Sequence, residues 1–241
     1  GVHAFSTATA TSTVTVNAVN DAPIAAITPS SYTVNEQTTL TLHGTGLSIS
    51  DVDAASSTVS ATLSVVSGTI SVTAGTTGVT VSGSGTNSVT LTGTLTQINN
   101  LLAGNLSGTV TYTLNSDTPP GSDTLTLTAN DQGNTGSGGA LTSTDTATIN
   151  ITALNDAPIA AITPSSYTVN EQTTLTLHGT GLSISDVDAA SSTMSVTLSV
   201  GEGALTVTAG STGALVSNSG TSAVTITGTI TQINNLLAGN G

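Results

Sequence analysis

Apolar and polar residues alternate with period two along most of the chain. In residues 147–153 (Ala-Thr-Ile-Asn-Ile-Thr-Ala) every second residue is apolar, and the same alternation runs through 40–42, 61–65, 89–91, 110–114 and 125–129. Clusters of Gly, Ser and Asn separate these runs. Short alternating segments bounded by turn residues are typical of half-buried β-strands, and Thr suits the solvent face of such strands. The pattern predicts an all-β fold, an antiparallel β-sandwich of the immunoglobulin-like kind.

One segment, residues 94–104, departs from this alternation and has apolar residues at helical spacing: Leu95, Ile98, Leu101 and Leu102. Thr94 followed by Gln97 forms a capping box, and Gly104 can adopt the left-handed conformation that ends a helix. We therefore expect one short helix that covers an end of the sandwich. Residues 229–239 repeat the pattern and predict a second such helix.

The chain contains a long internal repeat. Residues Asn20–Thr58 are identical to Asn155–Thr193 over 39 residues at an offset of 135, and Thr11–Asn20 aligns with Thr146–Asn155. A period of this length is the size of a domain, so the repeats are tandem domains with about eight to ten strands each. We expect residues 1–20 to hold the final strand of a preceding repeat (Ser6–Val19), 21–155 to form a complete repeat, and 156–241 an incomplete following repeat. The natural polypeptide is expected to extend in both directions.

The composition excludes several classes of function. The 241 residues include no Lys, Arg, Cys or Trp, and 13 Asp and Glu give a formal net charge of −13. Binding to nucleic acid or to anionic membrane surfaces requires cationic side chains, and disulfides and thiolate metal sites require Cys. No apolar run is long enough for membrane insertion. The 36 % hydrophobic content and a mean hydropathy of +0.26 favour an ordered protein over a disordered one.

The acidic residues concentrate near predicted strand ends and turns. Asp51 and Asp53 form an Asp-Val-Asp motif that Asp186 and Asp188 repeat. Two carboxylates so placed repel each other unless a cation lies near them, and the chain has no Lys or Arg to supply one. Oxygen ligands without Cys or His favour Ca²⁺ over zinc or copper, and Mg²⁺ needs a tighter octahedron. The alternative is a solvated loop that only keeps the protein soluble. Four other acids are interpreted as surface charges: Asp117, Asp123, Asp145 and Glu202.

Four motifs resemble, in order, the calcium-binding motifs of cadherin repeats. Tyr32–Glu36 resembles the segment with the early Glu, Asp51–Asp53 the Asp-x-Asp motif, Ala129–Gly133 the Ala-x-Asp-x-Gly motif, and Asn155–Pro158 the Asn-Asp linker. The chain looks most like the cadherin-like repeats of very large secreted bacterial adhesins. The resemblance covers the whole 135-residue unit and implies an immunoglobulin-like sandwich with Ca²⁺ at the domain junctions.

The resemblance also implies a ligand set for each junction. The first set is Asn20, Asp21, Asp51, Asp53 and Asp131. The second set is Glu36, Asn155, Asp156, Asp186 and Asp188. The Asp-Arg-Glu motif of cadherins has no counterpart in this sequence, and residues 94–104 lengthen the unit. We therefore expect one or two ions at each junction rather than three.

The leading hypothesis is a non-enzymatic module, a calcium-rigidified extender of an extracellular bacterial adhesin whose partners are the neighbouring repeats of the same chain. No Ser-His-Asp arrangement stands out in a chain so rich in Ser and Thr, and the few aromatics argue against a sugar-binding cleft. His43 and His178 share strand parity with outward-facing Thr residues, so both are expected to be exposed.

Two other hypotheses remain open. The last repeat lacks the strands that follow Asn105 in the complete one, so a strand from an identical neighbouring chain could complete its sheet. The protein would then be a subunit of a self-assembling filament, sheath or surface layer. Alternatively, the loops at 82–85 or 133–139 could contact a ligand.

Overall fold

The computed structural model describes residues 7–134 and 136–241, so Ser6, where the expected first strand begins, and residue 135 of the 133–139 loop lie outside the described residues. The chain divides into two compact units, Gly1–Thr152 and Ala153–Gly241. No helix in the described part of the chain is long and apolar enough to cross a membrane.

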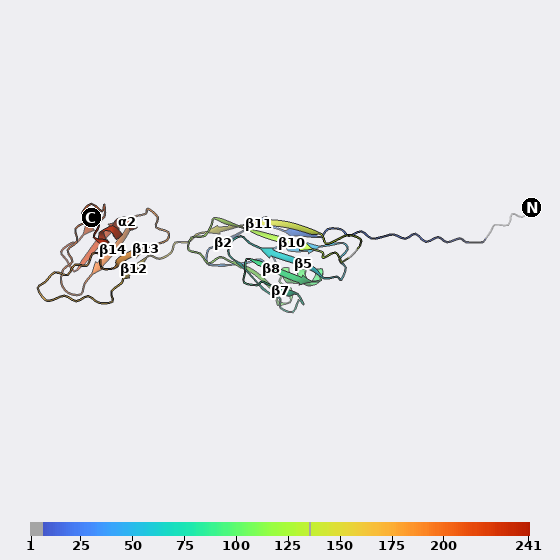
Figure 1. Ribbon diagram of the computed structural model, residues 1–241, viewed down its shortest axis with the longest axis horizontal. Helices are drawn as coiled ribbons and strands as arrows, with labels where there is room; N and C mark the ends of the chain where they lie inside the picture. Colours follow the sequence, from blue (N-terminus) through green and yellow to red (C-terminus); the bar gives the residue numbers. More distant parts are fainter. Residues whose placement is uncertain (1–6, 135) are drawn as a thin grey trace, which may run out of the picture. The chain divides into compact units, whose positions relative to one another are not determined.

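The first unit is a β-sandwich (Figure 1). Its strands are β1 (Ile24–Ile27), β2 (Ser31–Asn35), β3 (Thr39–Thr41), β4 (Leu47–Ser50), β5 (Val59–Ser64), β6 (Thr69–Thr73), β7 (Thr80–Ser82), β8 (Ser88–Gly93), β9 (Thr109–Thr113), β10 (Ser122–Asn130) and β11 (Thr142–Thr152). One sheet has the order β2-β11-β10-β5-β8-β7 and the other the order β3-β9-β6, while β1 pairs with β4. These eleven strands, within the described residues of the unit, slightly exceed the eight to ten expected.

The predicted all-β class is confirmed, and the alternation places the core. Leu63, Leu91 and Leu127 of the larger sheet are fully buried in one hydrophobic cluster with Ile70 and Tyr112 of the smaller sheet. The antiparallel prediction is wrong for one pair, because β11 runs parallel to β2. Period-two alternation looks the same in parallel and antiparallel pairs, so the sequence pattern does not specify strand direction.

The predicted helix is confirmed as α1 (Leu95–Leu102), and a 3₁₀ turn, η1 (Asn105–Ser107), follows it. The side chain of Thr94 accepts a hydrogen bond from the backbone of Gln97, and the side chain of Gln97 accepts one from the backbone of Thr94, as the capping box requires. Gly104 is left-handed, with a φ of 75°. The helix buries Ile98, Leu101 and Leu102 in the core and so covers part of the sandwich.

The second unit repeats only part of this arrangement. It contains β12 (Ile159–Ile162), β13 (Leu182–Ser185), β14 (Met194–Ser199), β15 (Leu215–Ser217), β16 (Ala223–Gly228) and α2 (Ile230–Ala238). Residues 166–170 and 174–176 have the sequences of β2 and β3 but form no strand. In the first unit β2 pairs with β11, and β3 pairs with β9. The described residues of the second unit contain no counterpart of β9 or β11, so the two segments have no such partners there.

Residues 7–18 likewise form no strand, although Thr11–Asn20 aligns with part of β11 and its linker. In the first unit β11 pairs with β10 and β2, whereas residues 7–18 have no such strand neighbours in the described part of the chain. Val19 makes one isolated bridge, to Ser137. The strand expected over Ser6–Val19 is therefore not formed in the described residues 7–19.

Candidate functional site

Asn20 anchors the chain entering the first unit to the loop that follows β10. The residue is only 7 % exposed, and its Nδ2 donates to Asp131 Oδ2 at 2.6 Å and to the Gly139 carbonyl at 3.2 Å. Its backbone N–H donates to the Ser137 carbonyl at 3.2 Å, and the Ser137 N–H donates to the Ala18 carbonyl at 2.8 Å. The linker and the loop are thus joined by both backbone and side-chain contacts.

Asp131, at 3 % exposure, is a buried carboxylate surrounded by N–H donors. Its Oδ1 accepts from the backbone N–H groups of Gly133 and Leu141, each at 2.8 Å. Burial acts to raise the pKa of Asp131, but the hydrogen bonds from Leu141, Gly133 and Asn20 outweigh it, and the pKa lies below its ordinary value of 3.8. The side chain is therefore an anion at neutral pH.

Asp51 and Asp53 lie in the loop that follows β4. Asp51 Oδ1 accepts from the N–H groups of Asp53 at 2.8 Å and Ala54 at 3.1 Å. Asp53 Oδ2 accepts from the N–H of Asp21 at 2.6 Å. The structure therefore connects Asp21, Asp51 and Asp53 in a chain of hydrogen bonds, and it connects Asn20 with Asp131 separately.

Helix α1 holds the strand from which this acidic loop departs. The side chain of Asn99 accepts from the N–H of Ile49 at 3.0 Å and donates to the carbonyl of the same residue at 2.8 Å. Asn234 makes the same pair of bonds to Ile184, at 2.9 and 2.8 Å. The helical insert thus contacts the backbone two residues before the Asp-Val-Asp motif in both units.

Two oxygens of this region are buried without a hydrogen-bond partner in the described part of the chain: Asn20 Oδ1 and Asp51 Oδ2. A buried polar atom left unpaired costs about 1–3 kcal/mol. Among residues 7–134 and 136–241, no three or more His, Cys, Asp or Glu side chains form a group that could hold a metal ion. The two unpaired oxygens are one amide and one carboxylate oxygen, and both are ligand types that Ca²⁺ accepts.

The second unit reproduces the acidic loop. Asp188 Oδ2 accepts from the N–H of Asp156, and Asp186 Oδ1 accepts from the N–H groups of Asp188 at 2.9 Å and Ala189 at 3.0 Å. Asn155, however, is exposed, and its Nδ2 donates to the carbonyl of Asp156 at 2.9 Å. The identical linker sequence therefore keeps its Asp contacts but not the contact that Asn20 makes with Asp131.

Glu36 belongs to the first unit, where it directly follows β2. The residue is buried, and its N–H donates to the carbonyl of Thr152 at 3.0 Å. The other four residues of its implied ligand set, Asn155, Asp156, Asp186 and Asp188, belong to the second unit. The structure therefore defines the surroundings of Glu36 and of the four residues separately.

The prediction that Asp123 is a surface charge is wrong. The residue is 4 % exposed, and its carboxylate accepts from Tyr112 Oη at 3.0 Å, Val66 N at 2.9 Å and Ser67 N at 3.0 Å. Asp123 has the same strand parity as Leu125 and Leu127, and this parity could have identified it as inward-facing. Burial, together with the hydrogen bond and the charge of Asp123, raises the pKa of Tyr112.

The other three acids interpreted as surface charges vary in burial. Asp145 is half-buried, and its Oδ2 accepts from the N–H of Ile27 at 2.8 Å, so it joins β1 to β11. Asp117 and Glu202 are exposed, as predicted.

The two histidines differ although they are repeat copies. His178 is exposed as predicted, whereas His43 is half-buried and its Nδ1 accepts from the N–H of Val110 of β9 at 3.1 Å. The exposure prediction is therefore wrong for His43. The alternating pattern placed it on an outward face but did not account for the neighbouring strand that reaches its ring.

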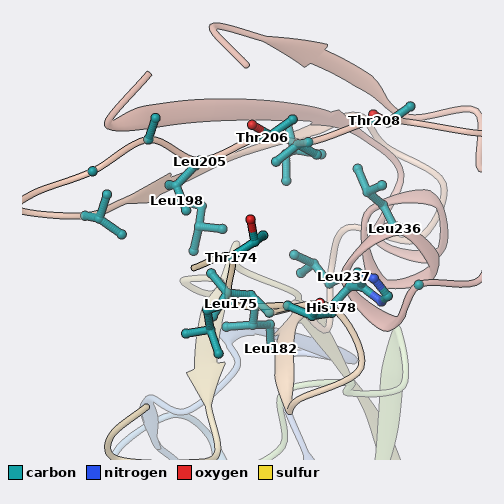
Figure 2. A pocket seen from close by; sticks show the side chains of 18 of the residues that line it. Thr174, Leu175, His178, Leu182, Leu198, Leu205, Thr206, Thr208, Leu236 and Leu237 are labelled. Carbon is teal, nitrogen blue, oxygen red and sulfur yellow. The ribbon is translucent and has the colours of Figure 1, made fainter. Parts of the chain in front are cut away.

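A cavity of about 790 Å³ opens in the second unit (Figure 2). Leu198, Leu205 and Leu237 are among the side chains around it. Their repeat counterparts, Leu63, Ile70 and Leu102, are fully buried in the first unit. There they share the core with side chains of β9 and β10, so the cavity corresponds to the space that those strands fill in the first unit.

No family model and no curated protein sequence matches the chain. A structure of the extracellular cadherin domains 1–5 of protocadherin gamma B2 matches 89 % of this chain at 14 % identity and a TM-score of 0.31. Domains 1–4 of protocadherin gamma B7 match 88 % at 13 % identity and a TM-score of 0.28. The chain spans 34 % and 42 % of these two structures.

A structure named BspA_C_WT matches 90 % of the chain, and 85 % of its own length, at 8 % identity and a TM-score of 0.26. TM-scores in this range establish no common arrangement of the strands. The fold assignment therefore rests on the strands and the core described above.

Proposed function

We propose that this chain is a non-enzymatic extender segment of an extracellular bacterial adhesin, in which Ca²⁺ binds at the junctions between β-sandwich repeats. The observation that carries the proposal is the pair of buried oxygens without a hydrogen-bond partner in the described residues, Asn20 Oδ1 and Asp51 Oδ2. They lie in a region rich in carboxylates, and the chain has no Lys or Arg.

The ligands at the first junction are drawn from Asn20, Asp21, Asp51, Asp53 and Asp131. Those of the second junction are drawn from Glu36, Asn155, Asp156, Asp186 and Asp188. Without an ion, the carboxylates of each set repel one another and the junction flexes. An ion that binds only the ordered junction stabilises it by RT ln(1 + [L]/Kd), about 2.7 kcal/mol when its concentration is 100 times Kd.

Two further features support an extracellular role. Calcium sites of extracellular modules bind with dissociation constants on the order of 10⁻⁴–10⁻³ M, which calcium at such concentrations outside cells can fill. The absence of Lys and Arg also removes every cleavage site of trypsin-like proteases, an advantage for a segment exposed outside the cell.

Chelation tests the calcium proposal directly. We expect EGTA to lower the melting temperature of the chain and to broaden its solution-scattering profile, and we expect excess calcium to restore both. The double variant Asp51→Asn and Asp53→Asn should weaken the calcium response. The matched control, Asp117→Asn, changes one exposed carboxylate outside both ligand sets and should leave the response unchanged. An identical melt and profile with and without EGTA would refute calcium binding.

A second candidate, a self-assembling filament, sheath or surface-layer subunit, is favoured by the cavity in the second unit. Strand β14 pairs with β16 on one side, and in the first unit the equivalent strand β5 also pairs with β10. A β-strand from an identical chain could add along this edge. Electron microscopy and sedimentation of the purified chain distinguish the candidates: ordered fibres support assembly, and separate particles at all concentrations support the extender.

A further inference from the structure

The loop after β10 contacts the incoming linker by means that involve no metal. Ala18, Val19 and Asn20 meet this loop through the parallel bridge between Val19 and Ser137. Two backbone hydrogen bonds join Ala18 and Asn20 to Ser137. The amide of Asn20 adds its bonds to Asp131 and Gly139. Linker and loop are more than 110 residues apart in the sequence, so these are tertiary contacts rather than local turn geometry.

Gly136 makes the close approach possible. Its φ is +82°, and a Cβ added there would lie 2.6 Å from both Asn20 N and the carbonyl carbon of Val19. Real Cβ atoms do not approach backbone so closely, so any other residue at 136 would displace the linker. Gly139, in the same loop, would place a Cβ with nothing within 4 Å. Only one of these two glycines is therefore required by the contact.

We propose that this loop is a metal-independent latch that binds the linker of the preceding repeat through residues Ala18–Asn20. The latch goes beyond the calcium proposal because its contacts are hydrogen bonds and close backbone packing, which persist when calcium is removed. It also accounts for the difference between the two repeat copies: Asn20 contacts the loop and is buried, whereas Asn155 has no such loop beside it among the described residues and is exposed.

The repeat gives the latch a consequence for tandem arrays. The counterparts of Ala18 and Asn20 are Ala153 and Asn155, and Ala153 directly follows the end of β11 at Thr152. In an array, the loop of the next repeat would bind the chain immediately after it leaves the sheet. Ala153–Asn155 would then be held by hydrogen bonds whether or not calcium is bound, while the acidic residues that follow them would still depend on the ion.

Amide hydrogen exchange of the chain in EGTA tests the latch. We expect the Asn20 amide to exchange at least about tenfold more slowly than that of Asn155, which serves as an internal reference with the same following sequence. Gly136→Ala should remove this difference, and the matched control Gly139→Ala should preserve it. Amides of β10 and β11 report in each variant that the sandwich is still folded.

Ser137→Pro provides a second variant, because it deletes the backbone N–H that donates to the Ala18 carbonyl. It should also accelerate exchange at Asn20. Equal exchange of Asn20 and Asn155 in EGTA would overturn the latch, as would unchanged protection in both Gly136→Ala and Ser137→Pro. Calcium titration of the same samples is scored separately, so failure of the latch and failure of calcium binding are distinguishable.

Discussion

The same 39 residues occur twice in this protein and fold differently. In the first copy, Ser31–Asn35 and Thr39–Thr41 are strands β2 and β3, whereas the identical residues 166–170 and 174–176 form no strand. The Asp-Val-Asp loop, by contrast, makes the same hydrogen bonds in both copies, and the helix that lies beyond the 39 residues has the same N-terminal capping box in both units. The elements that differ are those whose hydrogen-bond partners lie late in the repeat, in β9 and β11. Strand formation therefore follows the availability of partners rather than local propensity.

The largest expected effect comes from supplying the missing partners. A copy of Ser107–Thr152 added after Gly241 should convert residues 166–170 and 174–176 into strands and fill the cavity. We expect the second unit to gain a cooperative transition with a free energy of unfolding on the order of 5–15 kcal/mol. Hydrogen exchange of these residues measures the change. A Gly/Ser segment of equal length is the control, and unprotected amides in the extended chain would contradict partner dependence.

The next largest effect should come from removing a core side chain of the first unit. Tyr112 of β9 is fully buried and donates to the buried Asp123. Tyr112→Ala should destabilise the first unit by about 3–5 kcal/mol because it removes a large core side chain. Tyr112→Phe, which removes only the hydroxyl, should cost about 0.5–1.5 kcal/mol. Thermal or urea unfolding followed at signals of each unit checks this, and an equal loss in the second unit would show that the units are not independent.

Alkaline pH should also destabilise the first unit more than the second. Burial and Asp123 raise the pKa of Tyr112 in the folded state above its ordinary value of 10.0. The contribution of the neutral hydroxyl is therefore fully present below pH 10 and is lost as the pH rises above it, by about 1.4 kcal/mol for each pH unit while the folded residue stays protonated. Urea midpoints of the first unit between pH 9 and 12 measure the loss. Tyr112→Phe should remove this dependence on pH; if it persists in that variant, another group is responsible.

The smallest effect should be shared by both copies. Thr94 and Thr229 cap α1 and α2 with the same pair of hydrogen bonds. Thr94→Ala should destabilise the first unit, and Thr229→Ala the second, by about 1 kcal/mol each. Chemical unfolding of the two single variants tests whether the loss of stability is the same for α1 and α2, although the described residues of the second unit contain no counterparts of β9 and β11. A much larger loss of stability in one unit would show that the helix also depends on strands that lie late in the repeat.

The core strands and both helices were predictable from the sequence. Alternation in β5, β8, β10 and β11 matches their burial, and the Thr94–Gln97 capping box is present as expected. Asp123 is an exception: a lone acid among Thr residues favours a surface position, but its strand parity is inward and the structure buries it. His43 shows a true limit, because its partner Val110 lies 67 residues away.

The candidate site also combines contacts that are local in the sequence with contacts that depend on a distant loop. The resemblance to cadherin repeats groups Asn20, Asp21, Asp51, Asp53 and Asp131, and the structure connects them as two hydrogen-bonded sets. The Asp-Val-Asp turn is local and forms in both copies. The contact of Asn20 with Asp131, and the role of Gly136 beside it, depend on a loop more than 100 residues further along the chain. Their calcium ligation stays a prediction.

The sequence by itself determined the elements whose stabilising contacts lie within a few residues: the capped helices, the acidic turns and the faces of the strands. Only the tertiary structure decided which identical segment becomes a strand, which Asn is buried and where a cavity opens. The physical reason is that a β-strand and a buried amide need hydrogen-bond partners from distant parts of the chain. A capping box or an Asp turn instead finds its hydrogen-bond partners within about two or three residues.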